Sequence, residues 1–512
     1  MAGKYQLTTF GCKVSQYESQ QLRETLESIG LRAAGPHEVP DLAVVNTCAV
    51  TSEAVRKGDQ AIRRLSRGGL TSVVVVGCGA SADAGRLGNS SHVAAVFGHD
   101  VDVPTELRKL IVDRLKLCSP NSSDPVRPSA QPAAARQALR MNEIRMSPFS
   151  ASQGAEASSP FGGAAFPIND SARYLPIVNT PEVLLGRIES FVGHQRAFLK
   201  IQDGCDAFCT YCIIPRLRPH VRSKPIDLVV AEAEGLVRAG HKEIILTGIF
   251  LGAYGRDTAI RKRFGTASSP LADVVRAVAD IDGLTRLRLS SLEPGDVDDA
   301  LLEVFVSQSR CVPHLHLPMQ SGSPAILRRM NRQYTVDAFL AMIERVRSAL
   351  DRPAITTDLI VGFPGETDAD FEASLEVGRQ AEFLKIHAFP FSPRAGTAAA
   401  RWQKEFVSRS EVRRRMGRLA AVERECSVRY RRRLLGTVER VIVETGPDAA
   451  DTPWETTRSG RADRYLEVHF EAADVVPGEV ARVRIDRLTP TRTHGTHLRP
   501  AASSYPLAIF PW

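Results

Sequence analysis

The segment Cys205-Asp206-Ala207-Phe208-Cys209-Thr210-Tyr211-Cys212 decides how the rest of the chain is interpreted. Its three cysteines have the spacing C-x3-C-x2-C and follow an apolar run, Ala197 to Ile201, so we expect a loop that leaves a strand. Thiolates suit zinc or iron–sulfur iron, and a four-iron cluster with three protein ligands keeps one iron open. A structural zinc site needs a fourth ligand, and the nearest candidate, His220, lacks the usual spacing. The segment therefore favours a three-cysteine iron–sulfur cluster over a zinc site or unligated thiols.

Length and composition narrow the class of protein. With 512 residues and 43% hydrophobic content, the chain is long enough for about three domains. It has no run of about 18 apolar residues and no signal-peptide pattern at its start, so we expect a soluble cytoplasmic protein without a membrane partner. Nine cysteines, an odd number, favour thiolate chemistry in a reducing compartment over a disulfide scaffold. The net charge of +8 is compatible with a polyanionic partner.

Residues 1–117 repeat one pattern, in which an apolar run ends in a short turn and a cysteine. Helical segments, Ser19–Ile29 and Ser52–Leu65, follow the first two cysteines, and such alternation predicts an amino-terminal parallel α/β domain. Because parallel sheets bind ligands outside the carboxyl ends of their strands, we expect the three cysteines to meet at one edge. A second three-thiolate cluster is the sharper hypothesis, and three half-buried thiols are the alternative. The runs with their cysteines are Tyr5–Phe10 with Cys12, Leu42–Val45 with Cys48, and Val73–Val76 with Cys78.

Residues 118–181 and 182–400 differ sharply in composition. The first segment is rich in Ser, Pro, Ala and Gly, which predicts a low-complexity linker. In the second, six strand-helix units alternate, which predicts a central partial (βα)6 TIM-type barrel with its site at the carboxyl ends of the strands. The predicted strands are Arg196–Gln202, Glu243–Thr247, Leu284–Leu289, Val312–Leu317, Ile355–Val361 and Phe383–Phe389. The predicted helices are Leu228–Ala239, Leu271–Ala279, Asp299–Val306, Val336–Leu350 and Asp368–Gln380.

Glycine and polar residues follow four of the predicted barrel strands. Glycine lets the backbone approach a ligand closely, and a carboxylate can bind ribose hydroxyls or an ammonium group. Turns that only connect strand to helix are the alternative. These residues share one face of the predicted barrel, which favours a ligand site. Its candidate residues are Gly248, Glu293, Gln320 and Gly362.

The last part of the chain is basic and then β-rich. Residues 401–434 carry many arginines on a helical background, which predicts a basic connector that is either a solvated helix face or an RNA contact. Residues 435–498 hold short β runs separated by Gly and Pro turns, which predict a small β-barrel. The predicted runs are Glu439–Glu444, Tyr465–Phe470 and Glu479–Ile485. Residues 499–512 are expected to form a weakly structured tail.

The spacing of Cys205, Cys209 and Cys212 resembles the signature of radical SAM enzymes. Taken with the amino-terminal cysteines, it makes nearly the whole chain similar to the radical SAM methylthiotransferases. In that family the cysteines corresponding to Cys12, Cys48 and Cys78 bind an auxiliary 4Fe-4S cluster. The carboxyl-terminal region, with Gly460 to Tyr465 and Val468, resembles a TRAM domain, which binds RNA.

Three further segments are similar to one branch of this family, which methylthiolates threonylcarbamoyladenosine beside the anticodon of tRNA. They are Gly11 to Ser19, Asn46 to Thr51 and Ile360 to Thr367. The isopentenyladenosine branch usually carries Gln-Met-Asn after its first cysteine, and the ribosomal-protein branch carries Pro-Lys-Asn. Ser15 stands where the threonylcarbamoyladenosine branch usually has Asn. Activity on the other two substrates, another radical SAM activity and a non-catalytic RNA-binding role are the alternatives.

The resemblance implies S-adenosylmethionine and two 4Fe-4S clusters as cofactors. One cluster would be held by Cys205, Cys209 and Cys212, and the other by Cys12, Cys48 and Cys78. It implies that a deoxyadenosyl radical removes hydrogen from adenine carbon-2 and that the auxiliary cluster presents a methylated sulfur. The residues expected to line the S-adenosylmethionine site are Gly248, Glu293, Gln320 and Gly362. The implied partners are a tRNA anticodon stem-loop, an electron donor such as flavodoxin or ferredoxin, and a sulfur source, and we expect a monomer.

Overall fold

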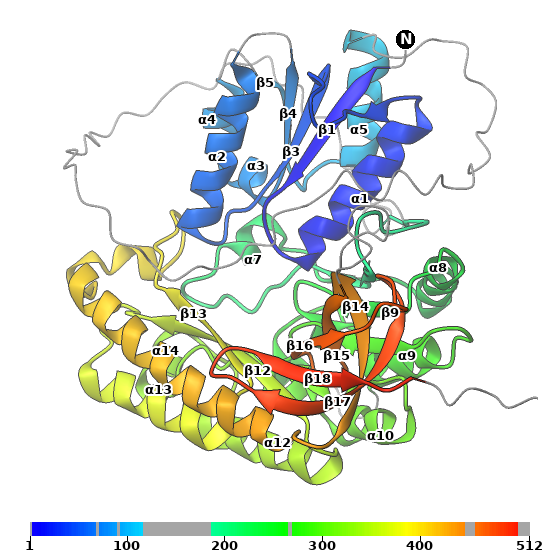
Figure 1. The fold of residues 1–512 in the computed structure, drawn as a ribbon. Coiled ribbons are helices and arrows are strands. Elements are labelled where there is room, and N and C mark those ends of the chain that lie inside the picture. The colour runs from blue at the N-terminus through cyan, green and yellow to red at the C-terminus, as the bar shows by residue number, and fades with distance from the viewer. Residues whose placement is uncertain are drawn as a thin grey trace, which may run out of the picture.

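The computed structural model describes residues 3–67, 71–89, 93–115, 186–264, 269–445 and 456–499. An amino-terminal α/β part, a central barrel and a carboxyl-terminal β-barrel follow one another along the chain (Figure 1). This confirms the predicted fold class. The predicted linker, residues 118–181, lies outside the described residues, as does the tail beyond residue 499.

The amino-terminal part is a five-stranded sheet in the order β2-β1-β3-β4-β5, and all its pairings are parallel. The central strands β3 and β4 are buried over nearly their whole length, as expected for apolar runs covered by helices on both faces. Its strands are β1 (Lys4–Thr9), β2 (Arg32–Ala33), β3 (Leu42–Thr47), β4 (Ser72–Gly77) and β5 (Val93–Phe97). Its helices are α1 (Lys13–Ser28), α2 (Ser52–Ser66), α3 (Cys78–Ala82), α4 (Ala84–Gly88), α5 (Val103–Lys109) and η1 (Leu110–Leu115).

The central barrel is open and has six parallel strands in chain order. Two three-stranded sheets, β6-β9-β10 and β11-β12-β13, are joined by the parallel bridges Leu287–Cys311 and Ser291–His316. The strands are β6 (Arg196–Lys200), β9 (Glu243–Thr247), β10 (Arg286–Leu289), β11 (His314–His316), β12 (Ala354–Val361) and β13 (Lys385–Pro390). A short antiparallel pair, β7 (Gln202–Asp203) and β8 (Arg222–Ser223), flanks the cysteine segment.

Amphipathic helices cover the outside of this barrel. Leu287 and Leu289 point into the apolar layer under the helices, whereas Arg286 and Arg288 on the same strand point into the barrel, as strand alternation requires. The helices are α7 (Ile214–Leu217), α8 (Ile226–Arg238), α9 (Pro270–Ala279), α10 (Asp299–Ser307), α11 (Pro324–Arg329), α12 (Val336–Ala349) and α13 (Asp368–Ala381). Short 3-10 turns lie at η3 (Leu251–Ala253), η4 (Arg261–Arg263), η5 (Pro294–Asp296), η6 (Ala399–Arg401) and η7 (Gln403–Glu405).

Helix α14 (Arg409–Arg432) leads into a closed barrel with the order β14-β15-β16-β18-β17. Two arginines of α14 are buried inside the protein, whereas most of the others are exposed on the helix surface. Arg415 is buried against Glu366, and Arg431 donates to three backbone carbonyls beyond β17. Sequence reasoning missed two strands of the barrel, β15 and β18. The strands are β14 (Val438–Thr445), β15 (Thr457–Ala462), β16 (Glu467–Glu471), β17 (Val480–Leu488) and β18 (Thr493–His497).

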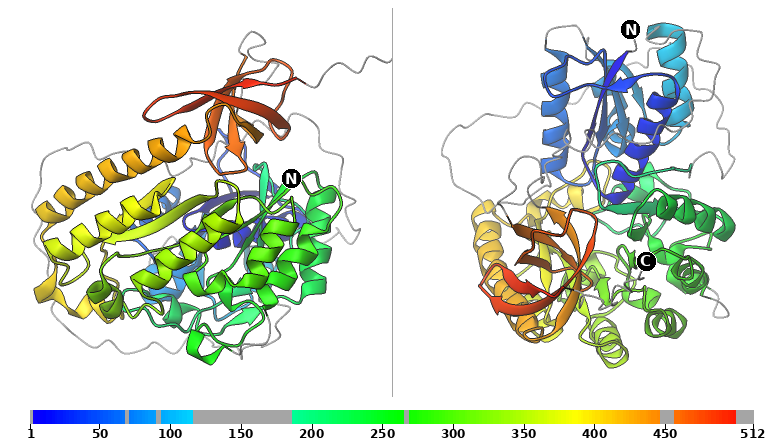
Figure 2. Two further views of the ribbon diagram at one scale, coloured as in Figure 1. Left: turned by 90° about the horizontal axis from the view of Figure 1, so that it is seen from below. Right: turned by 45° about the vertical axis from the view of Figure 1, so that its right-hand side comes forward.

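The two ends of the central barrel are covered by different parts of the chain (Figures 1 and 2). At the carboxyl ends of the strands, Glu18 of α1 pairs with Lys200 of β6, and Ser52 of α2 contacts Ser392 just after β13. At the amino ends, Arg286 pairs with Asp463 in the turn between β15 and β16. The amino-terminal sheet therefore faces the end of the barrel at which a ligand site is expected.

Candidate functional site

Cys205, Cys209 and Cys212 lie on the loop between β7 and α7, at the carboxyl end of the first barrel strand. Backbone hydrogen bonds fix the loop: Cys205 N–H donates to the carbonyl of Arg218 at 3.0 Å, and Cys212 N–H donates to that of Cys209 at 2.9 Å. Between the first two cysteines, Phe208 has a φ of 50° and is 60% exposed. The structure thus places this segment on the predicted loop.

The electrostatics of this loop fit a bound cationic cluster. Burial raises the pKa of Cys212 to about 12, and the charge of Cys209 adds to the effect. Burial also raises the pKa of Cys205, and Cys209 and Cys212 contribute. Three partly buried thiolates repel one another unless iron supplies the compensating charge, so the donor set suits a cluster held by thiolates.

Arg332 is a charged neighbour of the loop that sequence reasoning did not identify. Its Nη1 lies 3.2 Å from the Sγ of Cys209 and 3.3 Å from the hydroxyl of Tyr211, while Nη2 pairs with Glu293. Glu293 is one of the predicted S-adenosylmethionine residues, and it also lies 3.4 Å from Arg261. Arg332 therefore connects the cysteine loop to the carboxylate that follows β10.

The amino-terminal cysteines meet at one edge of the sheet. Cys12 is the N-cap of α1, Cys48 follows β3, and Cys78 begins α3. Their strands β1, β3 and β4 are adjacent and in register, with Thr9 opposite Asn46 and Thr47 opposite Gly77. Burial raises the pKa of Cys78 to about 12, and the charges of Cys12 and Cys48 contribute, so the three thiols are close enough to interact.

Two backbone details hold this edge in place. Gly77 has a φ of 91°, and a Cβ there would lie 2.2 Å from Asn46 Oδ1 and 2.7 Å from the carbonyl oxygen of Thr47. His99 from the turn after β5 places its Nε2 3.3 Å from Cys78 Sγ. Burial lowers the pKa of His99 to about 4, so its imidazole is neutral at physiological pH. His99 is a second neighbour that no local pattern indicated.

The two cysteine triads, Cys12/Cys48/Cys78 and Cys205/Cys209/Cys212, face each other across the junction of sheet and barrel. Cys78 packs with Ile213 and Ile214 in one group of buried apolar side chains, and Cys205 and Cys212 lie against this group. Among the described residues, no three His, Cys, Asp or Glu side chains surround a point that suits a single metal ion. A four-iron cluster needs wider spacing, because each thiolate binds a different iron.

A charged network lies beside this junction. Glu18 of α1 accepts hydrogen bonds from Lys200 at 2.9 Å and from Arg218 at 2.9 Å, and Asp203 pairs with the same two cations. Lys200 and Arg218 side chains are only 2% and 3% exposed. Buried charges are stable only when they are paired, so this network holds α1 in a defined position over the barrel.

The other candidate residues occupy the predicted strand ends, but local packing explains part of their chemistry. A Cβ on Gly248 would lie 2.8 Å from Gln202 Oε1. Gly362 has a φ of 75°, and a Cβ there would lie 2.5 Å from Val412 of α14. Gln320 has a φ of 61° and donates its N–H to the carbonyl of Asp358. Their contact with S-adenosylmethionine stays a prediction.

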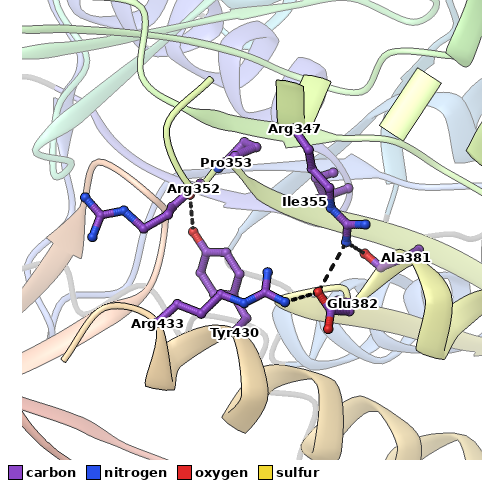
Figure 3. Close-up of a pocket in the computed structure, with 8 residues that line it drawn as sticks. All are labelled: Arg347, Arg352, Pro353, Ile355, Ala381, Glu382, Tyr430 and Arg433. Carbon is purple, nitrogen blue, oxygen red and sulfur yellow. Dashed lines mark hydrogen bonds and ion pairs between the residues drawn. The ribbon is translucent and has the colours of Figure 1, made fainter. Parts of the chain in front are cut away.

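One pocket of about 220 Å³ lies elsewhere, beside the amino end of β12 (Figure 3). Arg347 and Arg433 both pair with Glu382, and the Tyr430 hydroxyl donates to the carbonyl of Arg352 at 2.8 Å. Glu382 thus offsets the positive charge of the pocket. Because it is at the end of the barrel opposite the cysteines, we assign it no part in the chemistry.

Two family models match the chain. Residues 199–377 match the Radical SAM superfamily, and residues 4–98 match Uncharacterized protein family UPF0004. A curated relative from Thermotoga maritima, named threonylcarbamoyladenosine tRNA methylthiotransferase MtaB, is 32% identical over 94% of this chain and 94% of its own length. The chain belongs to the radical SAM methylthiotransferases of the MtaB type. A Bacillus subtilis relative of the same name is 31% identical, over 93% of this methylthiotransferase and 92% of the relative.

Other relatives place this methylthiotransferase within a wider group. A Mycobacterium bovis relative named tRNA-2-methylthio-N(6)-dimethylallyladenosine synthase is 33% identical, over 96% of this chain and 86% of its own length. Among solved structures, the radical S-adenosylmethionine methyltransferase TsrM from Kitasatospora setae has a TM-score of 0.51 and 16% identity, covering 78% of this chain and 74% of that one. At this identity the likeness shows the fold alone.

Family membership confirms two predictions from the sequence. The methylthiotransferase is a transferase, and its family implies S-adenosylmethionine and 4Fe-4S clusters, of which two are typical. The names of the relatives imply a tRNA substrate. In the part of the chain that the structure describes, no helix is long and apolar enough to cross a membrane.

Proposed function

We propose that the protein adds a methylthio group to carbon-2 of threonylcarbamoyladenosine next to the anticodon of tRNA. The observation that carries this proposal is the pair of cysteine triads that face each other at the mouth of the barrel. A hydrogen-abstracting centre and a sulfur-donating centre must reach the same adenine carbon. The MtaB relatives, which span nearly the whole chain, support the same reaction.

Each triad would hold one cluster. Cys205, Cys209 and Cys212 would hold the cluster that binds S-adenosylmethionine, and Cys12, Cys48 and Cys78 would hold the auxiliary cluster. When bound, these cofactors supply the radical and the methylated sulfur. Glu293, held between Arg332 and Arg261, is positioned near the first triad and is the candidate that best fits contact with the ligand. Gly248, Gln320 and Gly362 complete the proposed S-adenosylmethionine site.

The protein also shields the reacting atoms. The amino-terminal sheet lies over the strand ends of the barrel, and Ile213, Ile214 and Ala49 form an apolar contact between the triads. Excluding water from a radical site prevents side reactions. Glu18, Lys200 and Arg218 keep the two parts in register while the substrate base enters.

The remaining assignments follow from this function. The substrate region would be the anticodon stem-loop, bound in part by the carboxyl-terminal barrel, residues 435–498. An electron donor such as flavodoxin or ferredoxin and a sulfur source would serve the clusters. We place the enzyme in the cytoplasm as a monomer, with domains at 1–117 and 182–400, a connector at 401–434, and a linker at 118–181.

Mass spectrometry of tRNA nucleosides from a deletion strain tests the function. Loss of methylthio-threonylcarbamoyladenosine, with restoration by the wild-type gene, supports the proposal. Loss of the methylthio-isopentenyl nucleoside instead would assign the protein to the reaction named for the mycobacterial relative. If both nucleosides remain, the proposed reaction is wrong.

A further inference from the structure

The inward face of β11, β12 and β13 is polar where the barrel opens towards the cysteines. His316 Nε2 lies 3.3 Å from Asp358 Oδ2, and the rings of His316 and His387 are 5.7 Å apart. These three residues are neighbours across paired strands, because Asp358 is in register with His387 and His316 with Thr356. The side chains of His316 and Asp358 are 13% and 27% exposed, although they lie inside the barrel. They therefore face space that a ligand can reach.

A deeper layer of the barrel has a different role. Arg286 and Arg288 share Glu243, and their guanidinium groups also contact Asp463 in the carboxyl-terminal barrel. Tyr465 from the same turn stacks on His314 at 4.6 Å. These groups are buried and are held together by ion pairs and ring stacking, so they join the two barrels. His316, Asp358 and His387 lie above this layer and are not needed for that contact.

Lys13 belongs to the amino-terminal part that covers this end of the barrel, and its charge affects the same residues. It is the first residue of α1 and directly follows Cys12. Burial raises the pKa of Asp358, but His316, His387 and Lys13 together hold it below its usual value. Burial lowers the pKa of His387 to about 4, and the Lys13 charge contributes to the decrease. Among the described residues, Lys13 forms no ion pair, so its ammonium group has no carboxylate within ion-pairing distance.

The chemistry of adenine relates this position to the reaction. Carbon-2 and carbon-6 flank the same ring nitrogen, so a substituent on the carbon-6 amino group lies close to the carbon that is modified. A base whose carbon-2 faces the two triads can place that substituent near the residues beside Cys12. Lys13 is the nearest of these along the chain, and His316, Asp358 and His387 lie within reach of its charge.

We propose that Lys13, His316, Asp358 and His387 form the pocket for the substituent on the adenine amino group, and that Lys13 binds a carboxylate of that substituent. This inference rests on the proposed function and names the groups that select its substrate. Asp358 would accept a hydrogen bond from a hydroxyl or urea N–H, and the histidines would complete the polar surface. An apolar isopentenyl group would leave these side chains desolvated and unpaired, which disfavours its binding.

Binding of synthetic anticodon stem-loops tests this assignment without turnover. The probes carry threonylcarbamoyladenosine as the free acid, its neutral methyl ester, or isopentenyladenosine, and fluorescence anisotropy gives Kd for the full-length protein without S-adenosylmethionine. A charged hydrogen bond predicts that the wild type binds the acid about 10-fold to 100-fold more tightly than the ester. Lys13→Met is expected to reduce this ratio to about 1, and Lys13→Arg to restore most of it.

Two controls separate folding from recognition. Lys109→Met removes an exposed lysine of α5, far from the barrel, and is expected to keep the wild-type ratio. Asp358→Asn keeps the shape of the side chain and is expected to weaken binding of the acid and the ester alike, because both retain the hydroxyl and urea groups. Circular dichroism melts of each variant verify that it is folded.

The outcomes distinguish this inference from the proposed function. If the wild type modifies the threonylcarbamoyl stem-loop but folded Lys13→Met keeps the full preference for acid over ester, Lys13 does not bind the carboxylate and the inference is wrong. If the wild type modifies only the isopentenyl stem-loop, the proposed function fails, and the substituent pocket fails with it.

Discussion

The two cysteine triads are built in opposite ways. Cys205, Cys209 and Cys212 lie within eight consecutive residues, and one loop between β7 and α7 holds them. Cys12, Cys48 and Cys78 span most of the amino-terminal part and come together only because three parallel strands end at the same edge. The first triad is therefore a local feature of the chain, and the second is a consequence of sheet topology.

This difference affects how each triad responds to change. A local loop keeps its ligands near one another even when distant packing is altered. A site made from three strand ends needs correct register, close packing of the backbone at Gly77 and a stable sheet. The amino-terminal triad should therefore be the more sensitive of the two to substitutions in the surrounding fold.

The largest expected effect separates the two triads by their chemistry. Cys209→Ala should abolish deoxyadenosine formation, because it removes a ligand of the cluster that binds S-adenosylmethionine. Cys48→Ala should leave S-adenosylmethionine cleavage partly intact while the methylthio product disappears. Chromatography of the small-molecule products and mass spectrometry of the RNA measure both. A Cys48→Ala enzyme that still methylthiolates RNA would show that the roles assigned here are wrong.

Gly77→Ala should damage the amino-terminal triad alone. A Cβ would meet Asn46 and the backbone of Thr47, and the left-handed φ adds strain, so we expect destabilisation by about 3 kcal/mol. Iron per chain after anaerobic reconstitution should fall from about eight to about four. Gly85→Ala in α4 is the matched control, because nothing lies within 4 Å of its added Cβ. Equal iron in both variants would contradict a topology-dependent site.

Glu18→Gln tests the charged network beside the two triads. It leaves Lys200 and Arg218 with fewer negative partners, and we expect a loss of about 3 kcal/mol, seen as a lower unfolding temperature. Burial alone would raise the pKa of Glu18, but Arg218 and Lys200 lower it to about 2. Its contribution is therefore complete above pH 4.5 and declines as the pH falls towards 2.

The difference in unfolding temperature between wild type and Glu18→Gln should thus be constant from neutral pH to about pH 5 and decrease below it. Glu53→Gln is the control, because Glu53 pairs with Arg56 on the exposed surface of α2 and should change stability by a few tenths of a kcal/mol at most. A difference that grows on acidification would contradict the assigned charge states.

The smallest expected effect concerns Arg332, which lies next to the sulfur atom of Cys209. Arg332→Gln removes a positive charge next to Cys209 Sγ and should lower the reduction potential of the cluster on the loop, because hydrogen bonds and positive charge stabilise the reduced state. Redox titration followed by electron paramagnetic resonance measures it. The potential of the auxiliary cluster should not change in this variant, and a shift of both potentials would mean that the two sites are not independent.

Much of the fold followed from local patterns. The six barrel strands were predicted to within about two residues, because buried parallel strands form continuous apolar runs. The helix after Cys12 was placed too late, at Ser19, since its first turn carries few apolar residues; it begins at Lys13. β15 and β18 were missed because their exposed polar residues and glycine weaken the strand signal.

The site was predicted less completely. Spacing indicated the three cysteines of the loop, and their position after three apolar runs indicated that the other three would converge. Nothing in the local sequence pointed to Arg332, His99 or the network around Arg218, because each reaches its partner from another element. Lys13 had one available signal, its position next to Cys12.

The sequence by itself identified the six candidate cysteine ligands and the strands that present them, since ligand type, spacing and hydrophobic period are local properties. Only the tertiary structure decided how the two triads face each other and which charged groups surround them. Contacts such as Glu18 with Lys200, or Arg332 with Cys209, join residues more than 100 positions apart. Their geometry depends on how sheet and barrel pack, and no short segment encodes that packing.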